Sequence, residues 1–196
     1  VQELSSLQNV LYASNRHCLL LIFQAMDAAG KDSAIKHVMS GINPQGCQVT
    51  SFKAPGAEES SHDFLWRINK ALPPKGHIGI FNRSHYEDVL IVRVHNLVPK
   101  DEWQARYDQI NQFESLLEST GTTIVKVFLH ISKEEQRERL QARLNDPDKV
   151  WKFNSGDLKE REYWEEYRNA YETVFDVCRE PQWHIVPANH KWYRNL

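Results

Sequence analysis

The sequence predicts an α/β fold in which a five-stranded parallel sheet carries helices on both faces. Five apolar runs rich in β-branched residues are the expected strands, at residues 19–23, 47–52, 77–82, 123–130 and 183–188. Between them, apolar residues three and four positions apart predict helices at residues 62–72, 102–120 and 132–145. Because strands alternate with helices, the strands are expected to run parallel. The length of 196 residues suits one domain, residues 1–196.

Composition and charge exclude several classes of protein. The chain is 41% hydrophobic and 26% charged, as folded domains ordinarily are. No apolar run is long enough to span a bilayer and the first residues do not resemble a signal peptide, so we expect a cytoplasmic protein with no membrane partner. Three cysteines without metal-type spacing are expected to be reduced thiols. A net charge of -2 argues against a nucleic-acid partner, although residues 28–100 are locally basic and allow a polyanionic ligand.

A phosphate-loop pattern follows the first strand, where parallel sheets bind their ligands. The segment MDAAGKD ends in Gly30, Lys31 and Asp32 and opens a predicted helix. In a Walker A loop, backbone N–H groups cradle phosphate, the lysine reaches the transferred group and a hydroxyl residue holds magnesium. Here Ala25 stands in place of the first glycine and Asp32 in place of the hydroxyl residue, so a tight turn of small residues is the alternative. Asp27 would repel a phosphate unless a divalent cation lies between them.

The third strand ends in the segment FNRSHYEDV, which supplies further candidates. Arg83 can meet phosphate with a planar fork of N–H donors. In many P-loop enzymes this strand end carries an aspartate that holds magnesium, whereas here the position is Asn82. Glu87 follows a few residues later. For Arg83 and Glu87 the alternative is a solvated helix start, where acidic residues are favoured in the first turn.

The segment after the fourth strand predicts a mobile lid over about residues 137–165. A helix is broken by a proline and then resumes, and the break is rich in cations and aromatic residues. Its candidate lid cations are Arg139, Arg143, Lys149 and Lys152. A surface helical hairpin with i,i+4 ion pairs is the alternative, and we prefer that interpretation for the acidic second helix.

Several of these segments together resemble family-2 polyphosphate kinases. The matching motifs are MDAAGKD, FKAP, ALPPKGHIGIFNRSHYEDVLIVRVH, LNDPDKVWKFNSGDLKERE and VPANHKWYRNL, from about Leu19 to Leu196. The resemblance implies a P-loop kinase fold, similar to thymidylate kinase, with a helical lid. It also implies reversible, magnesium-dependent phosphoryl transfer between inorganic polyphosphate and nucleotides, with Mn²⁺ as a second candidate ion. Family members usually carry a longer N-terminal segment and more chain after the last motif.

The resemblance assigns roles to individual residues. Asp27 and Lys31 match the family's loop acid and lysine, with Asp27 as a metal ligand, and Arg83 matches its phosphate-binding arginine. Asn82 and Glu87 together resemble the class III subgroup, which phosphorylates both AMP and ADP, and Asn82 is a second candidate metal ligand. The catalytic candidates are Asp27, Lys31, Arg83 and Glu87. The candidates for phosphate or polyphosphate binding are Ala28, Ala29, Gly30, Lys31, Asp32, Ser33, Lys36, Lys53, Arg67, Arg83 and Arg93. Of these, Lys36, Lys53, Arg67 and Arg93 are included because a polyanion needs repeated positive contacts, and ordinary surface cations are the alternative.

Two other functions stay open at this point. An ATP-dependent nucleoside monophosphate kinase would share the fold and the chemistry, and the changes at Ala25, Asp32 and Asn82 also allow a nucleotide-binding module without catalysis. The expected partners are polyphosphate, AMP, ADP and ATP, with guanine nucleotides as further candidates. We also expect a homo-oligomer, either a dimer or a tetramer.

Overall fold

The computed structural model describes residues 2–147 and 155–196, which form one five-stranded parallel sheet with helices on both faces. The strand order is β2-β3-β1-β4-β5, and every neighbouring pair is parallel. The strands are β1 (Cys18–Ala25), β2 (Cys47–Ser51), β3 (Ile78–Asn82), β4 (Thr122–His130) and β5 (Trp183–Pro187). The predicted fold class is therefore confirmed.

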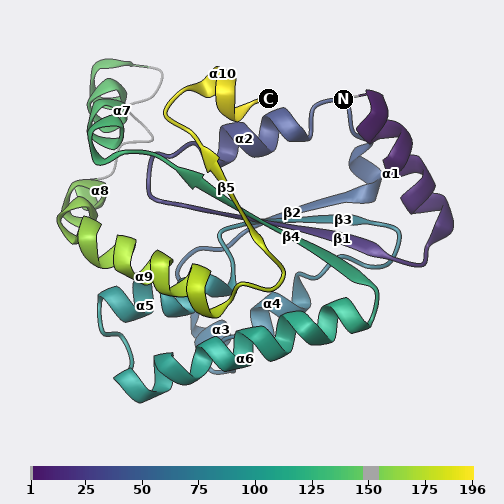
Figure 1. Cartoon of the computed structure of the whole chain (residues 1–196), viewed down its shortest axis with the longest axis horizontal. Helices are drawn as coiled ribbons and strands as arrows, with labels where there is room; N and C mark the ends of the chain where they lie inside the picture. Colours follow the sequence, from purple (N-terminus) through teal and green to yellow (C-terminus); the bar gives the residue numbers. More distant parts are fainter. Residues whose placement is uncertain (1, 148–154) are drawn as a thin grey trace.

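The helices form a layer on each side of the sheet (Figure 1). Above it in this view lie α1 (Gln2–Ser14), α2 (Lys31–Val38) and α10 (Lys191–Arg194), and below it lie α3 (Ala57–Ser60), α4 (Trp66–Lys70), α5 (Ile91–Val94), α6 (Lys100–Ser119) and α9 (Trp164–Val177). At one end stand α7 (Lys133–Asn145) and α8 (Ser155–Glu160). Three short 3₁₀ helices complete the described part: η1 (Pro44–Gly46), η2 (His85–Val89) and η4 (Arg161–Tyr163).

The core is densest around the central strand β1. Leu20 and Ile22 of this strand are fully buried, as is Ile80 of the neighbouring β3. Because helices cover both faces, these strands are apolar on both sides, which explains why they appear in the sequence as continuous apolar runs. The edge strand β2 is only partly covered, and its side chains are half-buried or exposed. Among the described helices, none is long and apolar enough to cross a bilayer.

The predicted helices agree less well with the structure than the predicted strands do. The pattern at residues 62–72 yields only the short helix α4, since Asp63 turns the chain by accepting a hydrogen bond from the backbone N–H of Leu65 at 3.0 Å. Ser132 and Glu135 have the spacing of a capping box, and Ser132 caps α7 by accepting from the backbone N–H of Glu135 at 3.1 Å. The Glu135 carboxylate pairs with Arg139 at 2.7 Å, so in this capping box the reciprocal bond is replaced by an i,i+4 ion pair.

Candidate active site

The phosphate loop joins the end of β1 to the start of α2 and contains two left-handed backbone positions. Ala28 has φ 61° and Gly30 has φ 99°. Such values are strained for alanine and easy for glycine. At Gly30 glycine has a second reason, because a Cβ there would meet a guanidinium nitrogen of Arg194 at 2.5 Å. With this backbone the loop passes around the N-terminus of α2, where the free backbone N–H groups of a helix can bind an anion.

Lys31, the first residue of α2, folds back along the loop. Its Nζ donates to the carbonyl oxygen of Ala25 at 3.2 Å. Burial lowers the pKa of Lys31, and the neighbouring positive charge of Arg83 lowers it further, while Asp27 and Glu87 oppose this effect. The ammonium is thus held at the mouth of the loop by one carbonyl and by the charges around it.

Arg83 lies at the end of β3 and faces the loop. Its own backbone has φ 64°, and its N–H donates to the carbonyl of Phe23 at 3.0 Å, which fixes the turn onto β1. The guanidinium donates to Asp27 Oδ1 at 3.0 Å. Burial acts to lower the pKa of Arg83, but the Glu87 and Asp27 carboxylates outweigh it and the pKa is raised. Arg83 therefore stays cationic beside the loop.

Glu87 lies one turn along η2 and is the second acid of this cluster. Burial raises its pKa, although Arg83 and Lys31 work in the opposite direction. With the Gln24 amide in the orientation that satisfies both neighbours, its nitrogen donates to Glu87 Oε1 at 3.0 Å and its oxygen accepts from Ser84 Oγ at 3.1 Å. The position of Glu87 is thus tied to β1 through Gln24.

Arg139, predicted as a lid cation, instead holds the phosphate loop and the chain after β5. Its guanidinium donates to the carbonyls of Ala28 at 3.1 Å and Ala29 at 2.8 Å. It also donates to the carbonyls of Ala188 at 2.5 Å and Asn189 at 3.0 Å. The reason is that α7 begins directly after β4, so its second turn lies against the loop. A guanidinium with these four backbone acceptors supports the loop's shape.

The C-terminal helix α10 supplies a second support. Arg194 donates to the carbonyl of Gly30 at 3.3 Å and to Ser33 Oγ at 2.9 Å. Gln136 of α7 adds a bond to the carbonyl of Asp27 at 3.0 Å. The loop is thus held from two separate segments of the chain.

Two cavities meet at this loop. The larger, of about 650 Å³, is a groove lined by the loop, the ends of β2 and β3, α7 and α10. Among the described residues its lining carries seven cations and three acids: Lys31, Lys53, Arg83, Arg139, Arg143, Lys191 and Arg194, with Asp27, Asp32 and Asp157. This excess of positive charge suits a polyanion.

The smaller cavity, of about 260 Å³, lies between η2 and α9. Its lining includes Glu87 on one side and the aromatic residues Trp164, Tyr167 and Tyr171 of α9 on the other. Asp27, Arg83 and Asp157 line both cavities, so the two spaces share one junction.

Most sequence-predicted residues are brought together here. The groove is lined by Ala28, Ala29, Gly30, Lys31, Asp32, Ser33, Lys53, Asn82, Arg83, Arg139 and Arg143, while Asp27, Arg83 and Glu87 line the smaller cavity. Arg143 pairs with Asp157 at 3.3 Å, linking α7 to α8 within the predicted lid. The lid cations Lys149 and Lys152 lie outside the described residues.

Three predicted phosphate-binding residues lie elsewhere. Arg93 donates to the hydroxyls of Tyr107 at 3.1 Å and Thr173 at 2.9 Å, so it joins α5 to α6 and α9 and is not part of the groove lining. Lys36 is exposed on α2 and is not part of the groove lining. Arg67 lines a neighbouring hollow of about 360 Å³ and donates to the carbonyl of Lys53 at 2.8 Å.

Sequence reasoning missed Arg194, Lys191, Gln136, Asp157 and the aromatic residues of α9. A signal existed for the two C-terminal cations, since they follow the fifth strand and the ends of parallel strands are where ligands lie. For Asp157 the signal was its proximity to the cationic break. Asp157 lines both cavities together with Asp27; burial raises the pKa of Asp157, and the charge of Asp27 raises it further.

The carboxylates of Asp27 and Asp157 are also the groups that could ligate a metal ion. Within the described ranges no group of three or more His, Cys, Asp or Glu side chains could hold an ion. Mg²⁺ is usually held by one or two carboxylates together with substrate phosphates, so Asp27 and Asp157 fit an ion that arrives with its phosphate ligand. Asn82 donates its amide N–H to Asp32 at 2.7 Å, so it could ligate only through its amide oxygen.

Two relatives match the chain over nearly all of its length. An ADP-polyphosphate phosphotransferase from Rhodopseudomonas palustris is 55% identical over 205 residues, covering 97% of this chain and 71% of that protein. An AMP/ADP-polyphosphate phosphotransferase from Meiothermus ruber is 52% identical over 196 residues, covering 99% of this chain and 73% of that protein.

A solved structure gives the same result. The crystal structure of polyphosphate kinase 2 from Arthrobacter aurescens TC1 superposes with a TM-score of 0.94 at 51% identity, covering 99% of this chain and 71% of that chain. The sequence model of the polyphosphate kinase 2 family matches residues 1–196. The chain therefore belongs to the polyphosphate kinase 2 family.

Proposed function

We propose that this protein transfers phosphoryl groups reversibly between inorganic polyphosphate and adenine nucleotides, converting AMP to ADP and ADP to ATP. The two relatives are named as an ADP-polyphosphate phosphotransferase and an AMP/ADP-polyphosphate phosphotransferase, which supports this. Guanine nucleotides are further candidate acceptors.

The junction of the two cavities carries the proposal. A polyanion in the groove and a nucleotide in the smaller cavity would bring their reacting oxygens together beside Asp27, Arg83 and Asp157. Phosphoryl transfer needs the attacking and leaving oxygens roughly in line, with charge on the transferred group neutralised. A groove on one side of the junction and a cavity on the other would let donor and acceptor approach the junction from different sides.

Each junction residue has a role that its geometry supports. The loop amides and Lys31 would bind the transferred phosphate, and Arg83, held by Asp27, would stabilise charge on its equatorial oxygens. Mg²⁺, or Mn²⁺, would neutralise phosphate charge when bound through Asp27, with Asp157 and Asn82 as further candidates. Glu87 would orient the acceptor nucleotide from the wall opposite the α9 aromatic residues.

A donor assay tests the proposal. Purified protein, Mg²⁺ and long-chain polyphosphate are incubated with AMP, ADP, GMP or GDP, and the nucleotides are separated by chromatography. ADP and ATP should appear from AMP and polyphosphate. Turnover only in a parallel tube with AMP and ATP would instead make the protein a nucleoside monophosphate kinase, and nucleotide binding without any turnover would make it a binding module.

Matched variants connect that activity to the loop. Lys31→Ala should reduce turnover by at least about 100-fold, as loss of a preorganised charge does elsewhere. Lys75→Ala is the control, because Lys75 is exposed before β3 and far from the carboxyl ends of the strands. Equal activities of the two variants would remove Lys31 from the mechanism.

The proposal also includes self-association, as a dimer or tetramer, and a cytoplasmic location. Exposed apolar side chains on α1 and on the edge strand β2, namely Leu7, Val10 and Val49, support self-association because water contacts them in the isolated chain. Light scattering after size exclusion gives the assembled mass. Free thiols at Cys18, Cys47 and Cys178 suit a reducing compartment.

A further inference from the structure

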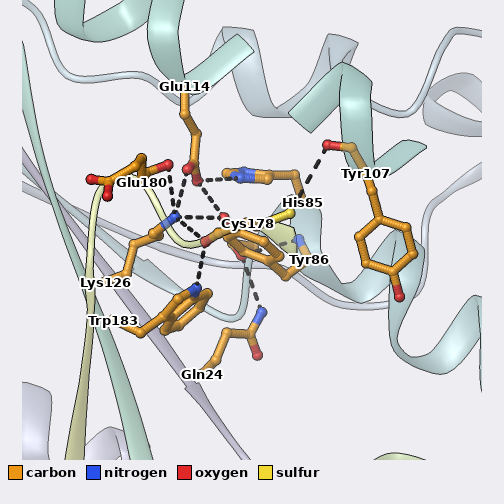
Figure 2. A network of polar contacts seen from close by, with 10 residues as sticks. Gln24, His85, Tyr86, Tyr107, Glu114, Lys126, Cys178, Glu180 and Trp183 are labelled. Carbon is orange, nitrogen blue, oxygen red and sulfur yellow. Dashed lines mark hydrogen bonds and ion pairs between the residues drawn. The ribbon is translucent and has the colours of Figure 1, made fainter. Parts of the chain in front are cut away.

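A network of charged and polar side chains is buried beneath the active site (Figure 2). At its centre Lys126 of β4 and Glu114 of α6, both with fully buried side chains, form an ion pair of 2.8 Å. Glu114 also accepts from the Tyr86 hydroxyl at 2.9 Å and lies 3.0 Å from His85 Nε2. His85 and Lys126 outweigh burial and lower the pKa of Glu114, so this carboxylate is ionised.

Such a pair is a poor device for stability alone. Removing two charges from water costs several kcal/mol per ion, and replacing buried ion pairs with uncharged residues is often neutral or even stabilising. Within β4, Lys126 lies between the apolar residues Val125 and Val127. The segments that this ion pair holds in place indicate a different role for it.

On one side the network holds the segment that carries two candidate catalytic residues. His85 and Tyr86 begin η2, between Arg83 and Glu87, and both are fully buried against Glu114. Ser84 Oγ accepts from the backbone N–H of Tyr86 at 3.2 Å. The same Ser84 contacts the Gln24 amide that holds Glu87.

On the other side the network holds the end of α9. Lys126 Nζ donates to the carbonyl of Cys178 at 3.0 Å and lies 3.4 Å from that of Glu180. Trp183 Nε1 donates to the same Cys178 carbonyl at 3.1 Å. Since earlier turns of α9 carry the aromatic wall of the smaller cavity, one ammonium is joined to both walls of that cavity.

We propose that Lys126 and Glu114 are positioning residues for phosphoryl transfer. They fix η2 against the C-terminal end of α9 and thereby set the distance between Arg83 and Glu87 on one wall and the α9 aromatic residues on the other. Neither residue touches the cavities, so they act through Tyr86 and His85. The inference rests on the proposed function for its turnover readout, although nucleotide binding tests it independently.

The experiment compares the full chain with the double variant Lys126→Met/Glu114→Gln, which removes both charges together. Misplacement by about 1 Å can cost about 100-fold in rate, so kcat should fall about 10- to 100-fold. The KM for the nucleotide should rise more than the KM for polyphosphate, because the groove is built mainly from the loop, the end of β2, α7 and α10 and shares Arg83 with the smaller cavity. Calorimetry should show weaker ADP binding even if polyphosphate proves not to be the donor.

A mutant cycle separates positioning from general loss of structure. In an Arg83→Ala background the double substitution should cause little further loss of kcat, because the network acts through the segment that carries Arg83. A general loss of folded protein would instead lower kcat by the same factor with and without Arg83→Ala. Ile110→Val is the matched control: it removes a methylene group from a fully buried site on α6 and should lower Tm without changing the KM for the nucleotide.

Tyr86→Phe keeps the test decisive if the double variant does not fold. It removes only the hydroxyl that bonds Glu114 and Lys126, and should lower kcat about tenfold with the ring still packed. Unchanged kcat and unchanged ADP affinity in the variants that fold would overturn the proposal. The proposal would also be overturned if the double substitution lowered kcat by the same factor with and without Arg83→Ala.

Discussion

Arg139 should act as a clamp on the phosphate loop, and its replacement by alanine is expected to lower stability and turnover together. The substitution removes hydrogen bonds to the carbonyls of Ala28 and Ala29 in the loop and to those of Ala188 and Asn189 after β5. Ala28 lies in the left-handed region, a conformation that persists only where surrounding contacts enforce it. Without the clamp the loop should relax away from this shape.

The magnitude follows from the number of bonds and their exposure. A hydrogen bond to a charged group contributes about 1.5–3 kcal/mol. The Arg139 side chain is 15% exposed, so water can replace part of what is lost and the four contributions will not add fully. We expect a loss of about 3 kcal/mol in the free energy of unfolding, equivalent to about 9 °C in Tm for a domain of this size. A loop displaced by about 1 Å would reduce kcat about 100-fold.

Thermal unfolding and steady-state kinetics on the same samples provide the test. Arg137→Ala is the control, because Arg137 is exposed on the same helix. Arg139→Lys should be intermediate, since one ammonium cannot reach all four carbonyls. If Arg139→Ala left Tm unchanged and raised only the KM for polyphosphate, Arg139 would be a substrate-binding lid cation and the clamp would be wrong.

Three further predictions concern Glu87, Asp88 and the divalent ion. Glu87→Asn should reduce AMP use much more than ADP use if this residue sets the subgroup's acceptor range, and equal losses in the chromatographic assay would argue against that. Burial raises the pKa of Asp88 to about 6, against the opposing charge of Arg106, from the ordinary 3.8. The folded state then holds this proton more tightly than the unfolded chain, so the free energy of unfolding should fall by about 3 kcal/mol as pH rises from about 4 to 6. Asp88→Asn should remove that slope in denaturant titrations, and parallel slopes would refute the shift. Chelation of divalent ions should abolish turnover while leaving Tm unchanged; a lower Tm would reveal a structural metal.

The strands and the phosphate loop were predictable because local sequence determines them. Strands buried on both faces are apolar along their whole length, and the five observed strands lie within two residues of the predicted runs. The loop was recognisable from Gly30 and Lys31 at a strand-to-helix junction, despite Ala25 and Asp32. Such features depend on residues close together in the sequence, so one chain suffices to find them.

The partners of individual cations were not predictable in the same way. Arg93 and Arg139 are both arginines in helical segments beside the expected site, yet one bonds hydroxyls on α6 and α9 and the other bonds loop carbonyls. Their acceptors lie up to about a hundred residues away in the sequence, and only tertiary packing brings them together. Lys126 illustrates the limit, since a lysine within an apolar strand gives no local sign of its buried carboxylate partner.

The cations around the groove divide into those that hold the loop and those that face its ligand, and this division bears on catalysis. Arg139 and Arg194 bond loop carbonyls and so belong to the first group. A loop with two left-handed residues would otherwise have to be ordered by its substrate, at the expense of binding energy. Because the protein itself supplies these bonds, the energy of binding polyphosphate is available to stabilise the transition state. A cation that never touches substrate can therefore still raise kcat.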